Sequence, residues 1–535
     1  MQFNLADLWE RVAQTVPDHL ALVCGARRLT YADVDERATR LANALADRGV
    51  RPGDHVGCYL YNGIEYLETM LAAFKLRAVP INVNYRYVED ELRYLFDDAE
   101  LRAVVFAREF APKLTRIRDD LPLLRSFVYV DDDSGTRLDG LGASEYEAAL
   151  RDAPARADFP ERSADDLYIL YTGGTTGPPK GVMWRHEDVF FGAMGGAGGG
   201  SAPIRTPEEI SERCREARTR CVPACPFMHG TAHWMAFSVL YTGGTVVIPP
   251  GRHFDPVGLW QLVAAEHANF LVIVGDAFAR PLVDALDSPA CAGLDLSGLQ
   301  VLLSGGAILS PALKAALVQR LPSAIVVDGY GASETGGQGQ AVTVAGGAIA
   351  TAPRFRVNDE TAVLDDRLRP ARVGVVGRLA RRGHIPLGYF KDPAKTAATF
   401  PVVDGVRWAV PGDHAIVEED GTITLLGRGS VSINTGGEKV YPEEVEAVLK
   451  GHESVFDAIV VGVPDERWGE LVVAIVQPRD GRRPVLADLQ HHARSHLAGY
   501  KIPRDLVVVD RIVRSPSGKP DYRWARSVAG ADAPR

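Results

Sequence analysis

Short apolar runs and helix-like segments alternate along most of the first 430 residues. The apolar run HVGCYL (55–60) is followed by the helix-like segment NGIEYLETMLAAFKL and a second apolar run, VPINVN, which predicts a strand–helix–strand unit. The same order recurs between residues 299 and 331 in LQVLLSGG, PALKAALVQRL and AIVVDGYG. This alternation predicts an α/β fold with mainly parallel sheets covered by helices. Ligands gather beyond the carboxyl ends of such strands, so the loops YTGGTTG, SGG and GYGASE are candidate binding loops.

The pattern changes near residue 430. The segment YPEEVEAVLK predicts a short amphipathic helix, with Val445, Val448 and Leu449 on one face and Pro442 near its start. The segments DAIVVGV and LVVAIVQPRD predict a hairpin, and VLADLQHHARSHL and DLVVVD add a helix and a strand. We therefore expect a large N-terminal domain, residues 1–428, and a small α+β C-terminal domain, residues 429–535, with a hinge near LGRGSVS.

Length and charge narrow the class of protein. A chain of 535 residues exceeds what one hydrophobic core accommodates, and 46% hydrophobic with 24% charged residues is typical of a globular protein. A net charge of −10 argues against nucleic-acid binding, although it allows an acidic substrate at a local basic site. The first twenty residues lack a signal-peptide pattern, and no apolar run approaches the roughly 20 residues that span a bilayer. We expect a cytoplasmic protein without integral membrane association; a monomer and a homo-oligomer are both compatible with the sequence.

The cysteine pattern argues against disulfides and against a metal site. Six cysteines in a chain of this length suit a reducing compartment. Four cysteine and histidine residues recur at intervals of four, as ligands on one helix would: Cys221, Cys225, His229 and His233. Pro223 and Pro226 exclude a regular helix there, and Gly230 stands where a zinc-protease helix carries Glu.

The first candidate loop, TGGTTGPPKG, resembles a phosphate cradle without being a P-loop. Lys180 follows Pro179 and precedes Gly181, whereas the P-loop lysine follows Gly and precedes Ser or Thr. Glycines let backbone amides point into one concavity, and threonine hydroxyls and a lysine add donors. Such groups could hold the outer phosphates of a triphosphate, and a structural turn is the alternative. The residues are Thr172, Gly173, Gly174, Thr175, Thr176, Gly177 and Lys180.

Two further segments carry candidate nucleotide ligands. In DGYGASETGG (328–337), the Tyr330 ring could stack on a purine, the Ser333 hydroxyl could contact a phosphate, and the Glu334 carboxylate could hold Mg²⁺. The alternative is a glycine-rich turn whose Glu is solvated. Downstream, Asp413 and Arg428 are candidates for a ribose diol.

A lysine near the end of the chain lies on a glycine turn. The segment RSPSGKPDYRW contains Lys519 directly after Gly518. Taken alone, such an exposed lysine is more often a solvated charge than a catalytic group.

Taken together, these motifs resemble a known family. The ordered set YTGGTTGPPKG, SGGA, GYGASE, PGD, GR, GGEKVYPEEVE and SGKPD resembles the adenylate-forming enzymes: acyl-CoA synthetases, amino-acid adenylation domains and firefly-type luciferases. The resemblance covers about residues 1–525. The segments RSADDLYILYTGGTTGPPKGVMWRHEDVF, GDAFARPLVDAL and LGRGSVSINTGGEKVYPEEVEAVLKGH are further similar to actinobacterial fatty-acid and steroid-side-chain acyl-CoA synthetases.

The resemblance implies an AMP-forming acid–thiol ligase that uses ATP, Mg²⁺ and coenzyme A. A carboxylate first attacks the α-phosphorus of ATP, and the CoA thiol then displaces AMP from the acyl-adenylate. By this resemblance, residues 172–180 hold the β- and γ-phosphates, Glu334 holds Mg²⁺, and Ser333 serves the α-phosphate. The implied adenine and ribose neighbours are Gly305, Gly306, Ala307, Asp328, Gly329, Tyr330, Asp413 and Arg428.

The resemblance also implies a moving C-terminal domain. Lys519 would stabilise charge between the carboxylate and the α-phosphate, and His229 would lie near the carboxylate and gate the CoA tunnel. After the movement, the loop 434–439 would reach the pantetheine tunnel with Gly436, Gly437 and Lys439. The sequence departs from the common pattern at Ser430, where many members have Asp or Lys, and at Pro411, where Thr is usual. The flexibility of Gly429 is expected to serve the hinge.

The acyl group and the acceptor stay open at this stage. The pocket segment PFMHGTAHWMAF has no carboxylate, which disfavours an α-amino acid. Its apolar residues favour a hydrophobic acid, and a long-chain fatty acid, a steroid side-chain acid and an aromatic acid all fit: Phe227, Met228, Trp234, Met235 and Phe237. An amide-bond synthetase is the alternative for the acceptor, although no carrier domain follows in this chain. A luciferase or a catalytically silent sensor is disfavoured, the sensor because Lys519 and Glu334 are both present.

Overall fold

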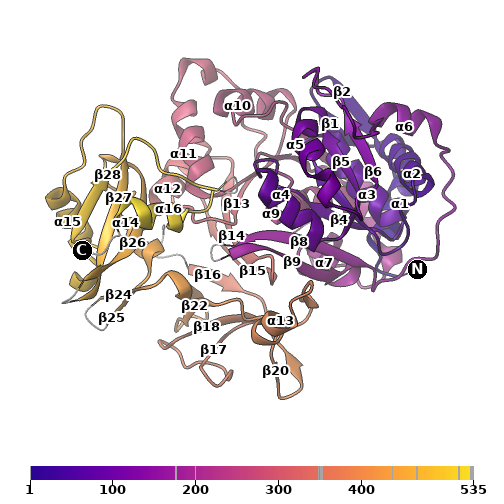
Figure 1. Ribbon diagram of the computed structural model, residues 1–535. Coiled ribbons are helices and arrows are strands. Elements are labelled where there is room, and N and C mark those ends of the chain that lie inside the picture. The colour runs from indigo at the N-terminus through magenta and orange to yellow at the C-terminus, as the bar shows by residue number, and fades with distance from the viewer. Residues whose placement is uncertain are drawn as a thin grey trace.

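The computed structural model has the predicted α/β architecture, with a large N-terminal and a small C-terminal domain (Figure 1). The described residues are 2–174, 177–198, 200–347, 349, 354–435, 438–465, 468–515 and 518–530. Of residues 173, 174, 177, 428 and 430, the backbone alone is described.

One sheet of the N-terminal domain has eight strands. In spatial order they are β19 (Gly388–Tyr389), β9 (Gly177–Arg185), β8 (Leu167–Gly174), β4 (Val79–Asn82), β3 (His55–Tyr59), β5 (Leu101–Ala107), β6 (Ser126–Val130) and β7 (Ser144–Glu145). Strands β3 and β4 are parallel and are joined by α3 (Ile64–Lys75), which confirms the first predicted strand–helix–strand unit. Strands β8 and β9 form an antiparallel hairpin at one side of the parallel strands.

The other large sheet has thirteen strands, and its centre is parallel. In spatial order they are β17 (Thr361–Leu364), β18 (Val376–Arg381), β22 (Asp413–Val417), β23 (Ile423–Arg428), β16 (Arg354–Val357), β15 (Gly336–Thr343), β14 (Ile325–Ala332), β13 (Val301–Gly305), β12 (Phe270–Ile273), β10 (Arg220–Pro223), β11 (Thr245–Ile248), β1 (Leu20–Cys24) and β2 (Arg27–Thr30). Strands β13 and β14 are parallel and are joined by α12, the second predicted unit. Beyond β14 the sheet continues with antiparallel strands, an extension that the alternating pattern did not predict.

Thirteen α-helices are described in the N-terminal domain. They are α1 (Leu5–Thr15), α2 (Tyr31–Asp47), α3, α4 (Glu89–Asp98), α5 (Ala111–Ile117), α6 (Tyr146–Asp152), α7 (His186–Gly192), α8 (Ile210–Arg213), α9 (Gly230–Tyr241), α10 (Pro256–Ala265), α11 (Gly275–Leu286), α12 (Pro311–Arg320) and α13 (Pro393–Thr399). Several begin at side-chain caps, for example Thr30 with Asp33 before α2 and Asp392 before α13, because such oxygens accept hydrogen bonds from the first free amides.

Short one-turn helices and a small hairpin complete the connections. The 3₁₀ turns are η1 (Arg108–Phe110), η2 (Arg118–Asp120), η3 (Gly195–Ala197), η4 (Pro207–Glu209), η5 (Cys214–Glu216), η6 (Pro289–Cys291), η7 (Gly429–Val431) and η8 (Gly499–Lys501). The hairpin consists of β20 (Val402–Val403) and β21 (Val406–Arg407).

One hydrophobic core joins the two large sheets. Helix α3 contacts β1 of one sheet as well as β3 and β4 of the other, and all its residues except Glu65 are buried. The charges on it are paired: Glu68 accepts from Arg37 at 2.6 Å, and Lys75 donates to Glu10 at 2.6 Å. Burial of a large apolar side chain contributes about 1.5–3 kcal/mol, so this core fixes the strand ends firmly.

The C-terminal domain is the small α+β unit predicted from the sequence. Its sheet contains β25 (Glu438–Val440), β24 (Ile433–Thr435), β27 (Gly469–Pro478), β26 (Val455–Asp465) and β28 (Asp505–Val508), and its helices are α14 (Pro442–Leu449), α15 (Leu486–Arg494) and α16 (Tyr522–Val528). Separate apolar clusters lie on the two faces of the sheet, one with α14 and α15 and the other with α16. In Figure 1 the domain lies beside α11 and α12 of the N-terminal domain.

Candidate active site

Two glycine turns predicted to neighbour a nucleotide lie side by side at the ends of parallel strands. Strand β13 ends at Gly305, which pairs in register with Gly329 of β14. A Cβ built on Gly305 would lie 3.5 Å from the Gly329 oxygen, and Gly306 has a φ of +90°, which favours glycine. The structure therefore brings Gly305, Gly306 and Ala307 next to Gly329 and Tyr330, at the edge where ligands bind in such sheets.

Asp328 and Tyr330 lie on either side of Gly329 in β14 and have different surroundings. The Asp328 carboxylate is buried and forms an ion pair with Lys314 of α12 at 2.6 Å. Burial raises the pKa of Asp328 to about 6, although Lys314 opposes the shift. The half-buried Tyr330 ring lies 5.7 Å from the ring of Phe355. The structure thus gives the Asp328 side chain a protein partner, so its backbone is the part left to face a base.

The predicted phosphate loop is the turn of the β8–β9 hairpin. Thr172 lies opposite Lys180 across the two strands, so both point from the same end of the hairpin. Thr175 and Thr176 lie outside the described residues, and of Gly173, Gly174 and Gly177 the backbone alone is described. Lys180 forms an ion pair with Asp392, the cap of α13, and the hydrogen bond from Lys180 lowers the pKa of that carboxyl. The sequence did not single out Asp392, whose position before Pro393 indicates only a helix cap.

Asn82 fixes the base of this hairpin. Its side chain accepts from the Tyr171 amide at 2.7 Å and donates to the carbonyls of Tyr171 and Met228, both at 2.8 Å. The Asn82 side-chain amide therefore holds the β8–β9 hairpin against the segment that ends in His229. Asn82 was not predicted from the sequence, where its one signal is its place in the second half of the predicted strand VPINVN.

The loop that carries Ser333 and Glu334 is held by three side chains from distant parts of the chain. Arg381 donates to the carbonyls of Thr335 at 2.6 Å and Gly337 at 2.7 Å. Trp184 donates to the Ser333 carbonyl at 3.1 Å, and Tyr389 donates to Glu334 Oε1 at 2.9 Å. These contacts fix a carboxylate beside the phosphate hairpin, since Trp184 lies in β9 and Tyr389 in β19, which pairs with β9.

A single carboxylate at this position fits a magnesium ion. Mg²⁺ is commonly held by one or two carboxylates together with substrate phosphate oxygens rather than by an all-protein cage. Glu334 is buried and its Oε1 is oriented by Tyr389, so the donor set is of the right kind. Among the described residues, no group of three or more His, Cys, Asp or Glu could hold a metal ion.

Asp413 and Arg428 are neighbours across two strands. Asp413 begins β22, Arg428 ends β23, and the two residues pair in register. Asp413 is buried, and Gly412 before it has a φ of +106°. The Arg428 side chain is not described. The two candidate ribose ligands, fifteen positions apart in the sequence, are thus brought to one place.

His229 and Lys519 come from different domains, and the charge of Lys519 acts on His229. His229 directly precedes α9, and its Nε2 is enclosed without a hydrogen-bond partner among the described residues. Burial lowers the pKa of His229 to about 3, and the nearby charge of Lys519 contributes in the same direction. His229 is therefore neutral at physiological pH and lies within electrostatic reach of Lys519.

The turn that carries Lys519 packs on the start of α11. The turn is closed by the Arg514–Pro520 bridge and by a hydrogen bond from the Lys519 amide to Ser515 Oγ at 3.1 Å. A Cβ built on Gly518 would lie 3.3 Å from the Val274 oxygen and 3.4 Å from Ala277 Cβ. The close approach and the φ of +74° explain why glycine precedes the lysine.

The loop expected to serve the second half-reaction is described only in part. Gly436 and Gly437 lie outside the described residues. Lys439 is exposed on β25, opposite Asn434. Its charge lies near His414 of β22 and helps burial to lower the pKa of that imidazole.

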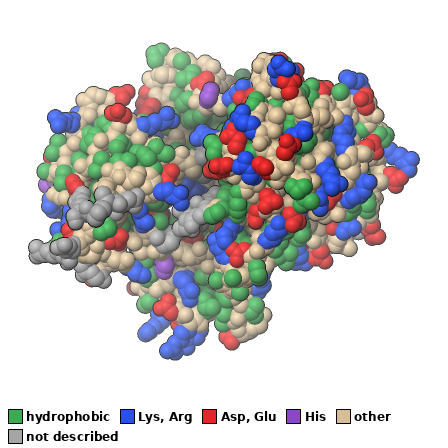
Figure 2. Space-filling model, in the orientation of Figure 1, with side chains coloured by type: hydrophobic (Ala, Val, Ile, Leu, Met, Phe, Trp, Pro, Cys, Tyr) green, Lys and Arg blue, Asp and Glu red, His purple; other side chains and the backbone are tan. Residues whose placement is uncertain are grey.

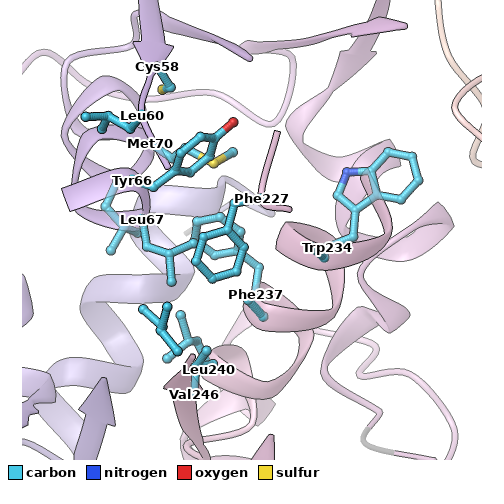
Figure 3. Close-up of a cluster of buried hydrophobic side chains, with 14 of the residues drawn as sticks. Cys58, Leu60, Tyr66, Leu67, Met70, Phe227, Trp234, Phe237, Leu240 and Val246 are labelled. Atoms are coloured by element: carbon cyan, nitrogen blue, oxygen red, sulfur yellow. The ribbon is translucent and has the colours of Figure 1, made fainter. Parts of the chain in front are cut away.

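Helix α9 separates core residues from those that face the site. Phe227 and Phe237 lie in the buried cluster with Tyr66, Leu67 and Met70 of α3 (Figure 3), so they belong to the core rather than to a pocket. Trp234 points to the other side of the helix and donates to Tyr168 at 3.0 Å.

A stripe of three half-buried residues runs along α9. Thr231, Met235 and Ser238 recur at helical spacing, and all three are less buried than their neighbours. The Thr231 hydroxyl lies 3.2 Å from a Cβ built on Gly306, and Ser238 Oγ lies 3.5 Å from one built on Gly195. Of these residues, the sequence interpretation named Met235 alone.

The four cysteine and histidine residues at intervals of four do not share a helix. Cys221 lies in β10, α9 begins at Gly230, and the prolines interrupt the segment as predicted. His233 Nδ1 lies 2.6 Å from the Phe227 carbonyl, and its Nε2 contacts Tyr168.

Charge and helix hydropathy characterise the part of the chain that the structure describes. Basic and acidic side chains are interspersed over the face in Figure 2. Within the described ranges, no helix has the length and apolarity needed to traverse a bilayer.

The chain is similar to known proteins over nearly its whole length. A family model described as AMP-binding enzyme matches residues 9–390, and one described as AMP-binding enzyme C-terminal domain matches residues 444–519. A 3-oxocholest-4-en-26-oate–CoA ligase from Rhodococcus rhodochrous is 47% identical, over 99% of this chain and 96% of the relative. A medium/long-chain-fatty-acid–CoA/3-oxocholest-4-en-26-oate–CoA ligase from Mycolicibacterium smegmatis is 46% identical, over 99% of this chain and 97% of the relative.

The fold matches solved structures equally completely. ATP-bound MatB from Rhodopseudomonas palustris superimposes with a TM-score of 0.83 and 26% identity, over 99% of both chains. The apo structure of the same protein gives a TM-score of 0.74 over the same share of both chains. The arrangement of this chain is thus nearer to the ATP-bound form.

Proposed function

Because this chain belongs to the AMP-binding enzyme family, we propose, from its site and its relatives, that it is an AMP-forming acyl-CoA synthetase. It activates a hydrophobic carboxylic acid with ATP and transfers the acyl group to coenzyme A. One observation carries this proposal: the turn of Lys519 packs on the start of α11, where the Gly275 amide donates to Ser304 beside the glycine turn at the end of β13.

The first half-reaction joins two anions, so its transition state needs positive charge and oriented donors. A carboxylate oxygen attacks the α-phosphorus of ATP, and the bond to the β-phosphate oxygen breaks, which releases pyrophosphate. The hairpin residues Thr172 to Lys180 hold the leaving phosphates, and Ser333 contacts the α-phosphate. Lys519 bridges the carboxylate and α-phosphate oxygens where negative charge develops.

Fixed side chains orient the nucleotide for this attack. The backbone of Gly305 to Ala307 and of Asp328 and Gly329 flanks the adenine, and Tyr330 stacks on it. Asp413 and Arg428 hold the ribose, a role that their cross-strand pairing supports. When bound at Glu334, Mg²⁺ neutralises phosphate charge.

The second half-reaction uses a different arrangement of the two domains. The thiol sulfur of CoA attacks the adenylate carbonyl, the bond to the phosphate oxygen breaks, and AMP leaves. The C-terminal domain, residues 429–535, turns about the hinge at Gly429, removes Lys519 and brings Gly436, Gly437 and Lys439 to the pantetheine tunnel. His229 gates that tunnel from the acyl side.

The acyl group lies along α9. The stripe of Thr231, Met235 and Ser238 begins beside Gly306 and leads towards Gly195, which supports an extended site that starts at the nucleotide. The relatives act on medium- and long-chain fatty acids and on 3-oxocholest-4-en-26-oate, so we propose the same two classes of acid here.

The test is a carboxylate panel assayed with and without CoA. Octanoate, palmitate, 3-oxocholest-4-en-26-oate, benzoate and glycine are each incubated with ATP and Mg²⁺, and pyrophosphate, AMP and thioester are measured. We expect pyrophosphate release with the fatty or steroid acids. We expect a thioester product from these acids when CoA is added. Pyrophosphate without thioester would refute the CoA acceptor and point to amide-bond synthesis, and a preference for benzoate would refute the acyl class.

A further inference from the structure

The start of α11 connects the adenine side of the site to the C-terminal domain. Ser304, the residue before Gly305, accepts a hydrogen bond from the Gly275 amide at 2.9 Å. The next residue, Asp276, accepts from the Ser310 amide at 2.7 Å. The first turn of α11 is therefore fixed to β13 and to the cap of α12, both of which belong to the N-terminal domain.

A buried ion pair crosses from this turn to the C-terminal domain. Lys450 caps the end of α14, and its Nζ lies 2.8 Å from Asp276 Oδ2. The two side chains are 4% and 8% exposed, so water does not screen their charges in this arrangement. Among the described side chains, Asp276 Oδ2 has no directed hydrogen bond, and Lys450 forms its ion pair, with the charges of Arg280 and Arg514 also nearby.

Other residues of α11 also contact the C-terminal domain. The Arg280 guanidinium lies 5.8 Å from the ring centre of Phe456 in β26, a cation–π contact. The Gly518 turn packs on Val274 and Ala277. Helix α11 thus contacts the end of α14, β26 and the turn of Lys519, in addition to the contact between β23 and α14.

Burial makes this ion pair selective for one arrangement. Desolvation of two charges offsets much of their attraction, so the pair adds little net affinity. A lone charge left at the interface after loss of its partner is strongly unfavourable. Docking in this orientation therefore depends on both residues, whereas an undocked domain can hydrate each of them.

We propose that Asp276 and Lys450 form a latch that holds the C-terminal domain in the arrangement for adenylate formation, with Lys519 beside His229. The latch rests on the proposed two-step function and adds two positioning residues to it. Thioester formation requires the latch to open. Asp276 and Lys450 consequently act in one half-reaction alone.

The test separates the two half-reactions in the full-length enzyme. Single-turnover pyrophosphate release measures adenylation, and CoA addition to the isolated acyl-adenylate measures thioester formation. We expect Lys450→Met and Asp276→Asn to slow adenylation about 10- to 100-fold, because each leaves a buried charge or polar group uncompensated at the docked interface. Thioester formation should stay within about twofold of the wild-type rate.

A charge exchange and a matched control make the result specific. The double variant Asp276→Lys with Lys450→Asp should recover adenylation relative to either reversed single variant, since the cycle isolates the pair. Lys501→Met removes a lysine that pairs with Glu444 at 2.7 Å inside the C-terminal domain, and it should leave both half-reactions unchanged. Equal loss in both half-reactions, or the same loss in Lys501→Met, would overturn the latch.

A measurement without catalysis separates the latch from the proposed function. Hydrogen exchange at residues 275–286 and 442–449 should be faster in Lys450→Met than in wild type, with exchange in β12 and β13 unchanged. If no acid in the panel releases pyrophosphate, the proposed function fails, and the exchange experiment still decides whether the ion pair holds the domains together. Unchanged exchange in both segments would refute the latch.

Discussion

The two domains contribute to the site in different ways. The N-terminal residues lie at strand ends of two sheets that share one hydrophobic core, and side chains such as Asn82 and Arg381 fix their loops. Lys519, in contrast, is an exposed residue of a domain whose own apolar clusters are small and separate. The position of the Lys519 turn relative to the N-terminal domain depends on its contacts with α11. The fold of the N-terminal domain therefore fixes the positions of its own site residues. The position of Lys519 depends on how the C-terminal domain docks on the N-terminal domain.

The largest expected effect tests whether the two domains are stabilised separately. Leu271 of β12 and Leu449 of α14 are both fully buried, each in the core of its own domain. Truncation to Ala should cost about 2–5 kcal/mol in either case. We expect Leu449→Ala to lower only the calorimetric transition of the C-terminal domain and Leu271→Ala only that of the N-terminal domain. A single transition that both variants lower equally would contradict the comparison.

The second prediction concerns the residue that docking delivers. Lys519→Ala should reduce adenylate formation by about 10²–10³, since removal of one preorganised charge at a developing anion has effects of this size. Thioester formation from isolated acyl-adenylate should continue at nearly the wild-type rate. Circular dichroism and thermal unfolding of the variant serve as the control, because the exposed side chain contributes little to stability. Normal adenylation by this variant would refute the catalytic role.

A smaller effect is expected from a side chain that the N-terminal fold already fixes. Tyr389→Phe removes the hydrogen bond to Glu334 and leaves the ring in place. A bond of this kind contributes about 0.5–1.5 kcal/mol, so adenylation should fall about two- to tenfold, with a higher Mg²⁺ concentration needed for half-maximal rate. Tyr241→Phe, which loses a 2.9 Å bond to the Leu5 carbonyl, is the matched control. An unchanged Mg²⁺ requirement in Tyr389→Phe would contradict the orienting role.

The smallest expected effect is on the pH dependence of stability. Burial lowers the pKa of His186 and His233 to about 4, below the ordinary value of 6.5. The unfolded chain therefore binds more protons between pH 6.5 and 4, and stability falls as the pH is lowered through this window. In the C-terminal domain, the half-buried His492 is the described histidine whose pKa burial lowers. Acid should thus lower the N-terminal transition more than the C-terminal one.

A variant at His186 identifies the source of this pH dependence. His186 Nδ1 lies 3.0 Å from Asn4 Nδ2 and accepts from the Leu5 amide at 3.3 Å, and a glutamine oxygen can accept both bonds. We expect His186→Gln to reduce the loss of melting temperature between pH 7 and pH 5 by a few degrees. Differential scanning fluorimetry across this range provides the measurement, and an unaltered slope would assign the pH dependence to other groups.

The sequence predicted what depends on local pattern. The strand–helix–strand units at residues 55–82 and 299–331 and the C-terminal α+β unit are confirmed, because hydrophobic periodicity reports local structure directly. The order of the motifs identified the family that the comparisons confirm. The positions of the glycine turns at strand ends also followed from this order.

Partners that are distant in sequence could not be predicted. Lys180 and Asp392 are 212 residues apart, and Lys450 and Asp276 belong to different domains. Nothing local indicates such pairs, since a charged residue on a helix or at a cap is ordinarily solvated. The pairing of Asp328 with Lys314 could not be predicted for the same reason. The sequence does not show that Lys314 of α12 lies against Asp328 of β14.

The register of Asp413 and Arg428 has a consequence for the fate of the reactive intermediate. Arg428 is the final residue of β23, and the hinge turn η7 begins at the next residue. In the proposed roles, Asp413 and Arg428 bind the ribose next to the hinge. They lie on strands of the N-terminal domain, which stay in place while the C-terminal domain moves. The acyl-adenylate, a mixed anhydride, can thus stay bound while the C-terminal domain moves from one arrangement to the other. It is then protected from hydrolysis and does not have to dissociate and rebind.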